Sequence, residues 1–182
     1  KTTLIKLANG LLTPTEGEIL VCGNVPGRES HACVSYLPER TAIPTWMSAA
    51  QLMDFYGDFY QDFRRDAAEE MLKRLEISPR QRIKQMSKGT REKVQLIMVM
   101  SRAARLYLLD EPIGGVDPAT RDYILSTIIT NYNPEAAVII STHLISDVEK
   151  VLDDVIFINR GQVVLQSSVD QIREEKGMSV DA

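Results

Sequence analysis

The stretch RLYLLDEPIGGVDP, residues 105–118, places a short apolar run directly before two adjacent carboxylates, Asp110 and Glu111. A continuous apolar run of this length is typical of a strand that is covered on both faces. Two more such runs follow, AVIIST (137–142) and VIFIN (155–159), and helical patterns separate the three. Because strands that alternate with helices form a parallel sheet, the sequence predicts an α/β domain.

The rest of the chain divides into helical patterns and two short strand patterns. Apolar residues recur at helical spacing from residue 2 to about residue 12, where Thr13 and Pro14 are expected to end the helix. The second half of segment 89–104 is apolar on nearly every face, which indicates a buried helix. The other expected helices are 48–76, split in two near 60–62, then 118–132 and 144–154. Short strands are expected at 18–23 and 33–37, separated by turn-forming residues.

Composition limits the classes of function. The 182 residues suit one domain, and 44% hydrophobic with 25% charged residues is the composition of an ordinary soluble protein. No apolar run approaches the roughly 18 residues that a membrane-spanning helix needs. The net charge of −4 provides no basic surface, so no nucleic-acid partner is expected. Cys22 and Cys33 have no metal-ligand spacing, and we expect two core thiols in a reducing cytosol.

Three titratable side chains follow the ends of predicted strands. Asp110 and Glu111 come directly after LYLL, and His143 comes directly after AVIIST. Ligands of a parallel α/β sheet bind beyond the carboxyl ends of its strands, so these groups are expected to converge. One carboxylate would hold Mg²⁺, and the other would accept a proton from an attacking water. The alternative is that either acid caps the turn after the strand.

The sequence begins with Lys1, Thr2 and Thr3 at the start of a predicted helix. A phosphate-binding loop ends in Gly-Lys-Ser/Thr, where the lysine reaches the β- and γ-phosphates and the hydroxyl binds Mg²⁺. On this interpretation the three residues bind nucleotide, Thr2 also holds the metal, and the helix N-terminus attracts the phosphates. A tripeptide has little weight alone, and its weight here comes from the motifs that follow it.

Six short motifs in chain order resemble the nucleotide-binding subunit of an ATP-binding cassette (ABC) transporter, and the resemblance covers the whole chain. They are KTT (1–3), YLPE (36–39), MSKGT (86–90), YLLDEP (107–112), GGVDP (114–118) and STH (141–143). The resemblance implies one P-loop NTPase-type domain, with a parallel sheet flanked by helices. Residues 1–45 and 105–182 would form the α/β core, and residues 46–104 a helical subdomain that includes the family signature.

The resemblance also implies roles for the strand-end residues. Asp110 looks like the Walker B aspartate that positions Mg²⁺, and Glu111 looks like the general base that polarises water against the γ-phosphate of ATP. His143 would be the switch histidine, which holds that phosphate and that water by hydrogen bonds. As a lone histidine it would more often be a structural residue. Phosphoryl transfer needs little more than positioning and charge neutralisation.

Ser87, Lys88, Gly89 and Thr90 occupy the place of the family signature, usually Ser-Gly-Gly-Gln, which binds ATP held by a second subunit. Lys88 and Thr90 depart from that pattern: Lys88 adds a Cβ where glycine is usual, and also a cation that could approach phosphate. The alternative is a plain serine cap on a core helix. Asp117 would lie in the segment that crosses between subunits, and it can also cap the helix that begins at Pro118.

Glu39 stands where the family commonly has a glutamine that touches Mg²⁺, and a carboxylate can keep this contact. Six of the chain's aromatic residues follow closely: Trp46, Phe55, Tyr56, Phe59, Tyr60 and Phe63. The helical spacing of Phe55, Phe59 and Phe63 favours a role in the core. Those left exposed could instead form a groove for a helix of a membrane partner.

The function implied by the resemblance is ATP hydrolysis that powers transport, with export favoured, through a separate membrane permease. A homodimer or heterodimer of ATPase subunits would enclose two ATP molecules with Mg²⁺, on the cytoplasmic face of the membrane. The family's phosphate-loop glycines precede its lysine, so a chain that starts at Lys1 is expected to bind ATP poorly. The alternatives are a non-catalytic regulatory module, a DNA-repair or translation-factor relative, and an adenylate-type kinase.

Overall fold

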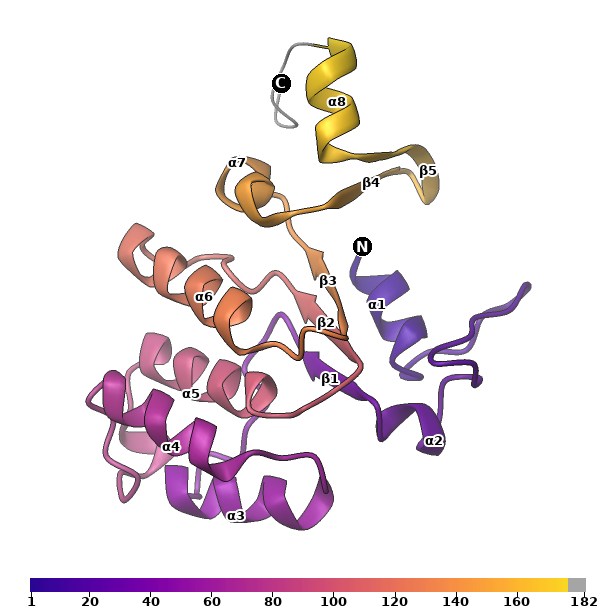
Figure 1. Cartoon of the computed structure of the whole chain (residues 1–182). Coiled ribbons are helices and arrows are strands. Elements are labelled where there is room, and N and C mark those ends of the chain that lie inside the picture. The colour runs from indigo at the N-terminus through magenta and orange to yellow at the C-terminus, as the bar shows by residue number, and fades with distance from the viewer. Residues whose placement is uncertain (177–182) are drawn as a thin grey trace.

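The structure is a computed structural model that describes residues 1–176. Its centre is a parallel sheet of β1 (Val34–Leu37), β2 (Leu106–Asp110) and β3 (Ala137–Ser141), in the order β1-β2-β3 (Figure 1). Leu106 pairs with Val34 on one side and with Ala137 on the other, so all three strands end at the same edge. The predicted α/β class with a parallel sheet is confirmed.

Helices cover both faces of this sheet. On one face, α5 (Lys88–Met100) and α6 (Pro118–Asn131) enclose a core that includes Tyr107 and Leu109 of β2. On the other face, Ile5 of α1 (Thr2–Ala8) packs with Leu108. Successive residues of a strand point to opposite faces, so β2 serves both cores and is buried from both sides.

The helices between β1 and β2 form a second core. It is built by α3 (Ala49–Phe59), α4 (Arg65–Arg74), the short 3₁₀ turn Ile83–Gln85 and the first half of α5, with Leu52, Leu72 and Ile83 fully buried. Ser48 caps α3 in a reciprocal pair with Gln51, which satisfies two backbone N–H groups. The predicted split of 48–76 near 60–62 is therefore confirmed, since α3 ends at Phe59 and α4 begins at Arg65.

One buried arginine ties this helical part to the sheet. Arg102 forms an ion pair with Asp62 at 2.9 Å and stacks on the Tyr60 ring at 3.8 Å. Its guanidinium also donates to the backbone carbonyls of Ala32 and Val34 at the start of β1. A buried charge is stable only when it is paired and hydrogen-bonded, so these partners explain why Arg102 can be buried.

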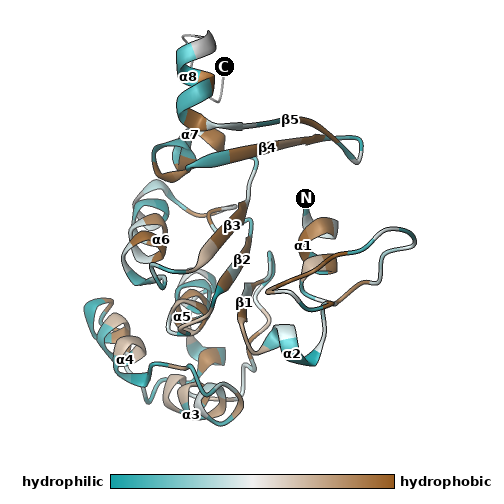
Figure 2. Ribbon diagram, turned by 45° about the vertical axis from the view of Figure 1, so that its right-hand side comes forward, coloured by the Kyte–Doolittle hydropathy of each residue, from teal (hydrophilic) through white to brown (hydrophobic). Residues whose placement is uncertain are grey.

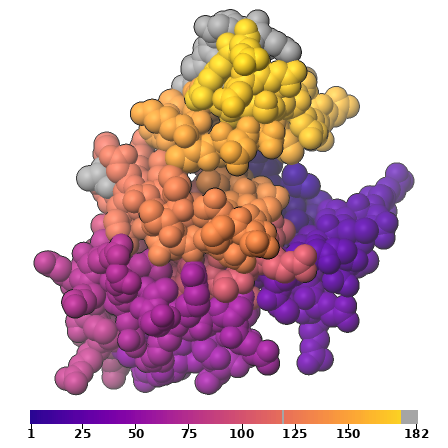
Figure 3. All heavy atoms as spheres, viewed as in Figure 1, coloured from indigo at the N-terminus to yellow at the C-terminus, as the bar shows by residue number. Residues whose placement is uncertain are grey.

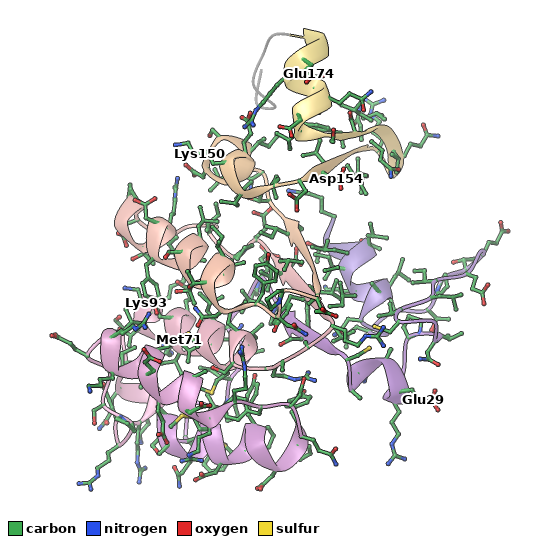
Figure 4. The ribbon with its side chains drawn as sticks, in the orientation of Figure 1. Glu29, Met71, Lys93, Lys150, Asp154 and Glu174 are labelled. Carbon is green, nitrogen blue, oxygen red and sulfur yellow. The ribbon has the colours of Figure 1, made fainter. Side chains whose placement is uncertain are left out.

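The expectations for residues 137–142 and 155–159 were wrong in part. Residues 155–159 lie in a strand, β4 (Asp154–Asn159), but it pairs antiparallel with β5 (Gln162–Ser168) and not with the central sheet. Neither β3 nor β4 is covered on both faces as predicted: Ile139 is 48% exposed and Ile156 is 54% exposed. Residues of both strands, which are largely hydrophobic in Figure 2, line one apolar cavity of ≈ 490 Å³. Asp154, the first residue of β4 and labelled in Figure 4, also lines it.

Three other boundaries differ from the sequence prediction. Helix α1 ends at Ala8 because Gly10, at φ +69°, turns the chain and lies against Pro26, where a Cβ would come within 3.3 Å. Segment 18–23 forms a single bridge between Val21 and Asn24 in place of a strand. Segment 144–154 contains only α7 (Ile145–Val148) and one 3₁₀ turn (Glu149–Val151) before β4 begins.

Three elements had no counterpart in the prediction: α2 (Arg28–His31), β5 and α8 (Val169–Lys176). Val169 and Ile172 of α8 close a small core against the β4–β5 hairpin. Helix α8 and the β4–β5 hairpin form one end of the molecule, seen at the top of Figure 3. No helix within residues 1–176 is long and apolar enough to cross a membrane.

Candidate nucleotide site

Asp110, the last residue of β2, is 1% exposed and lies where α1 meets the strand ends. Its Oδ1 accepts hydrogen bonds from Thr2 Oγ1 at 3.1 Å and from Ser141 Oγ at 2.6 Å. Its Oδ2 is buried and has no hydrogen-bond partner among residues 1–176. A buried carboxylate oxygen without a partner is costly, so this atom is a candidate ligand of a bound cation.

Glu111 lies next to it and faces two cationic or polar groups. Lys1 Nζ is 2.8 Å from Oε1, and His143 Nδ1 is 2.9 Å from Oε2. Burial by itself raises the pKa of this carboxyl, but hydrogen bonds and charges from Lys1 and His143 outweigh burial and hold the pKa below its ordinary value. Glu111 is therefore ionised at neutral pH.

The backbone at Glu111 is arranged to present this side chain. Glu111 has φ +50°, a conformation that non-glycine residues seldom adopt, and its N–H donates to the Ser141 carbonyl at 2.8 Å. Gly114 closes the following turn, where a Cβ would lie 3.3 Å from the Glu111 carbonyl oxygen. Local strain at a polar site is a reason to expect function there.

We call Lys1, Thr2, Asp110, Glu111, Ser141 and His143 the rim cluster, because they meet at the carboxyl-end rim of the sheet. Five of the six were singled out in the sequence, and Ser141 was not given a role there. The register could have found it, since Ser141 pairs directly with Asp110 at the ends of adjacent parallel strands. Thr3 is exposed on α1.

Glu39 lies just beyond the end of β1 and is exposed. Burial raises the pKa of the Tyr36 phenol, and the charges of Asp110 and then Glu39 raise it further, so both carboxylates act on one ring. Glu39 thus lies on the same side of the sheet as the rim cluster. In the part of the chain that the structure describes, no hydrogen bond or ion pair joins it to Asp110 or Glu111.

Ser87, Lys88, Gly89 and Thr90, here called the α5 turn, form the N-cap and first residues of α5; Ser87 and Lys88 are exposed, and Gly89 and Thr90 are half-buried. Ser87 Oγ accepts from the Thr90 N–H at 3.1 Å and lies 2.8 Å from Thr90 Oγ1, so the alternative of a serine cap is confirmed. Lys88 has an 80% exposed side chain and approaches Glu92 at 3.8 Å. It is helical, so its Cβ meets none of the restriction that a positive φ would impose.

Asp117 caps α6, as the sequence allowed. Its carboxylate accepts from the Thr120 N–H at 3.1 Å and from Thr120 Oγ1 at 2.7 Å. The hydroxyl bond and then the backbone bond from Thr120 hold the pKa of Asp117 below its ordinary value. Helices α5 and α6 are also joined by a cation–π contact. Lys93 Nζ of α5 (labelled in Figure 4) lies 5.8 Å from the centroid of the Tyr123 ring of α6.

The aromatic residues divide between core and surface. Tyr56 and Phe63 pack against the helical core with ring centroids 5.6 Å apart. Phe55 and Phe59 contact each other at 4.6 Å but are exposed, Phe59 at 69%, as is Trp46. The expectation that Phe55 and Phe59 belong to the core was wrong, because Leu52 and Met53 occupy the inward face of α3.

Comparisons with known proteins found similar sequences and folds. A family model described as ABC transporter matches residues 1–114. The SkfA peptide export ATP-binding protein SkfE of Bacillus subtilis is 29% identical over 96% of this chain and 76% of its own length. A solved ATP-binding subunit of an ABC transporter superposes with TM-score 0.86 at 25% identity, covering 100% of this chain and 80% of the other.

A second solved structure supports the fold. It is a dimeric, post-hydrolysis state of an ATP-binding cassette bound to ADP and Pi, with TM-score 0.76 at 19% identity, covering 92% of this chain and 79% of the other. This chain spans only 51% to 62% of the length of three other curated relatives, all of them uncharacterised ABC transporter ATP-binding proteins of bacteria.

Proposed function

The chain belongs to the ABC transporter family, and on that basis we propose that it is the ATP-binding and ATP-hydrolysing subunit of such a transporter. The observation that carries the proposal is the rim cluster. Lys1 and His143, from two distant segments, both bond to Glu111. Ser141 bonds through its hydroxyl to Asp110 and through its carbonyl to the N–H of Glu111. That combination suits a metal-bound triphosphate and an attacking water.

The side chains present fit Mg²⁺ and ATP. Within residues 1–176 no group of three or more His, Cys, Asp or Glu residues could hold a metal alone. Mg²⁺ in such sites takes one or two protein oxygens and otherwise water and phosphate, so a sparse donor set is what it needs. Thr2 Oγ1 and the unpartnered Oδ2 of Asp110 would hold it, with Glu39 as an outer contact. When bound, Mg²⁺ neutralises charge on the phosphate oxygens.

Glu111 would act as the general base. Its carboxylate would take a proton from water as the water oxygen bonds to the γ-phosphorus and the bond to the β–γ bridging oxygen breaks. Lys1 would move from Glu111 to the phosphates, and Thr3 would lie beside them at the helix start. Losing Lys1 removes the strongest of the partners that lower the Glu111 pKa, so the carboxylate becomes a better base. His143 would orient the water and the γ-phosphate.

We propose that the α5 turn binds ATP held by the rim cluster of a second ATPase subunit, either a copy of this chain or a related one. Its backbone N–H groups begin a 13-residue helix, and the N-terminus of a helix attracts anions. Lys88 adds an exposed cation at this position. Asp117 would lie near the same junction. The dimeric solved cassette supports this arrangement at the level of the fold.

The proposed division of the domain is a core of 1–45 and 105–182, of which 177–182 lie outside the described residues, and a helical subdomain of 46–104. Phe55, Phe59 and Trp46 expose apolar surface on that subdomain, which would receive a membrane permease subunit at the cytoplasmic face. Export is the favoured direction, since SkfE is named for peptide export.

The dimer formed by a Glu111→Gln variant of the full-length protein tests this proposal. We expect ATP to convert the variant into a persistent dimer, measured by size-exclusion chromatography, because binding continues while hydrolysis stops. Adding Ser87→Arg should abolish the dimer and leave ATP binding by the monomer intact. A double variant that still dimerises with ATP would exclude the α5 turn from the interface. If the unaltered full-length protein does not hydrolyse ATP, the proposed catalytic role of Glu111 is excluded.

A further inference from the structure

Two segments that leave the carboxyl ends of neighbouring strands carry Glu111 and His143. Residues 111–117 follow β2, and residues 142–148 follow β3. Near the sheet, the Glu111 N–H donates to the Ser141 carbonyl at 2.8 Å, and His143 Nδ1 lies 2.9 Å from Glu111 Oε2. The contact between Glu111 and His143 therefore depends on the spacing of these two segments.

Farther from the sheet, one arginine of α6 joins the two segments. Arg121 Nε donates to the Val116 carbonyl at 3.1 Å, and Arg121 Nη1 donates to Asp147 Oδ2 at 2.7 Å. Val116 follows Glu111 by five residues, and Asp147 follows His143 by four. The guanidinium thus bridges the far ends of the segments that carry the general base and the histidine.

Arg121 extends from a firmly held helix. Its backbone N–H donates to the Asp117 carbonyl at 3.0 Å, in the first turn of α6. The inward side chains of α6 are buried in the core that also contains Val148 of α7: Ile124, Leu125 and Ile128. The bridge therefore fixes the two segments to a packed element and not merely to each other.

The chemistry of the bridge suits an arginine. A guanidinium presents its N–H donors in one rigid plane, so a single side chain can hold a carbonyl and a carboxylate at a defined separation. A lysine ammonium is a point charge on a flexible stem and would not fix that separation. The side chains of Arg121 and Asp147 are 29% and 34% exposed, so water screens this ion pair less than one on the open surface.

We propose that Arg121 is a positioning residue for ATP hydrolysis, which holds His143 against Glu111 by linking the segment after β3 to the segment after β2. This inference rests on the proposed function. In the described residues, Arg121 makes no hydrogen bond to the rim cluster, so it acts through the position of His143.

The first test observes His143 without any turnover. The imidazole NMR signals of His143 and His31 are recorded in the nucleotide-free, full-length protein and assigned by their loss in His143→Gln and His31→Gln. We expect Arg121→Ala to shift or broaden the His143 signals. The His31 signals should stay in place, because His31 bonds to the Asn9 carbonyl in another part of the fold.

Two further variants sharpen this test. Asp147→Asn breaks the same ion pair from the other side, so it should change the His143 signals as Arg121→Ala does. Arg173→Ala is the matched control: it removes an ion pair of 3.3 Å to Glu149, two residues after Asp147. In the part of the chain that the structure describes, Arg173 has no bond to residues 111–117, so the His143 signals should not change.

The second test is kinetic. Small displacements of reacting groups are costly to the rate, so kcat for ATP hydrolysis by Arg121→Ala should fall about 10-fold while KM for ATP stays unchanged. In a His143→Ala background, Arg121→Ala should cause no further fall, because its effect passes through His143. Effects that simply multiply would contradict this route.

The outcomes separate this inference from the proposed function. Unchanged His143 signals or an unchanged kcat in Arg121→Ala would overturn the positioning role, and a lower melting temperature alone would show that Arg121 only stabilises the fold. Equal changes in Arg173→Ala would also overturn it, since any lost ion pair near α7 would then act alike. If the unaltered protein does not hydrolyse ATP, the proposed function fails, and the NMR measurement still decides whether Arg121 positions His143.

Discussion

The rim cluster and the α5 turn are both predicted to handle ATP, but they are built in different ways. In the rim cluster, side chains from α1, β2 and the segment after β3 bond to one another across more than 100 residues of sequence. In the α5 turn, the side chain of Ser87 bonds to Thr90 within the same turn, and Lys88 extends into solvent. The first region is assembled from distant segments of one chain, whereas the second is the region that we propose to bind ATP held by another subunit.

The two regions differ in which hydrogen-bonding groups they leave without a partner. In the described residues, the rim cluster leaves one buried oxygen of Asp110 without a partner, and this oxygen suits the cation that we propose there. The α5 turn leaves exposed N–H groups at the start of a helix, which suit an anion from another molecule. The predictions below separate these two kinds of site.

The largest effect is expected at the general base. Glu111→Gln keeps the shape of the side chain but removes its ability to take a proton, so ATP turnover by the full-length protein should fall about 10²- to 10⁴-fold. Nucleotide affinity should remain, measured by a fluorescent ATP analogue. The control is Glu135→Gln, an exposed glutamate outside the rim cluster, which should leave turnover unchanged. Normal hydrolysis by Glu111→Gln would remove this residue from its role.

The next effect concerns metal binding. Asp110→Asn preserves the acceptor for Thr2 and Ser141 but places an amide where the unpartnered oxygen was. The Mg²⁺ concentration for half-maximal ATP hydrolysis should rise about 10- to 100-fold. Asp122→Asn, on the exposed side of α6, is the control. An unchanged Mg²⁺ requirement would show that Asp110 has a purely structural role.

A smaller effect is expected at the α5 turn. Ser87→Ala removes the cap of α5, so the free energy of unfolding should fall by about 1 kcal/mol in urea titration. In the described residues no bond joins the α5 turn to the rim cluster. The change in free energy of unfolding caused by Ser87→Ala should therefore add to the change caused by Glu111→Gln when both are combined in a double variant. A clear departure from additivity would mean that the two regions are coupled within one chain.

The smallest effect is a pH dependence at Asp117. Its pKa in the folded chain lies below the ordinary value of 3.8, so the ionised cap contributes stability above that pH, which is lost as the pH falls through the lowered value. The melting temperature of Asp117→Asn should therefore lie below that of the unaltered chain near pH 5. The two values should converge at more acidic pH, and a constant gap would contradict this.

Much of the site could be predicted because its residues follow strand ends. Asp110, Glu111 and His143 come directly after apolar runs, and parallel strands bring such positions to one edge. The sequence did not predict a role for Ser141, because that role depends on the strand register that pairs it with Asp110. The ion pair between Lys1 and Glu111 and the position of Arg102 are contacts between distant segments, which no local pattern reports.

By itself, the sequence determined the alternation of strands and helices, the order of the motifs and the helix caps at Ser87 and Asp117, because these depend on neighbours along the chain. Only the tertiary structure decided that β4 pairs with β5 outside the parallel sheet, and that Phe55 and Phe59 face outward. Each of these outcomes depends on which segments, distant in the sequence, pack against a given set of apolar side chains. Periodicity reports that a face is apolar, but not what covers it.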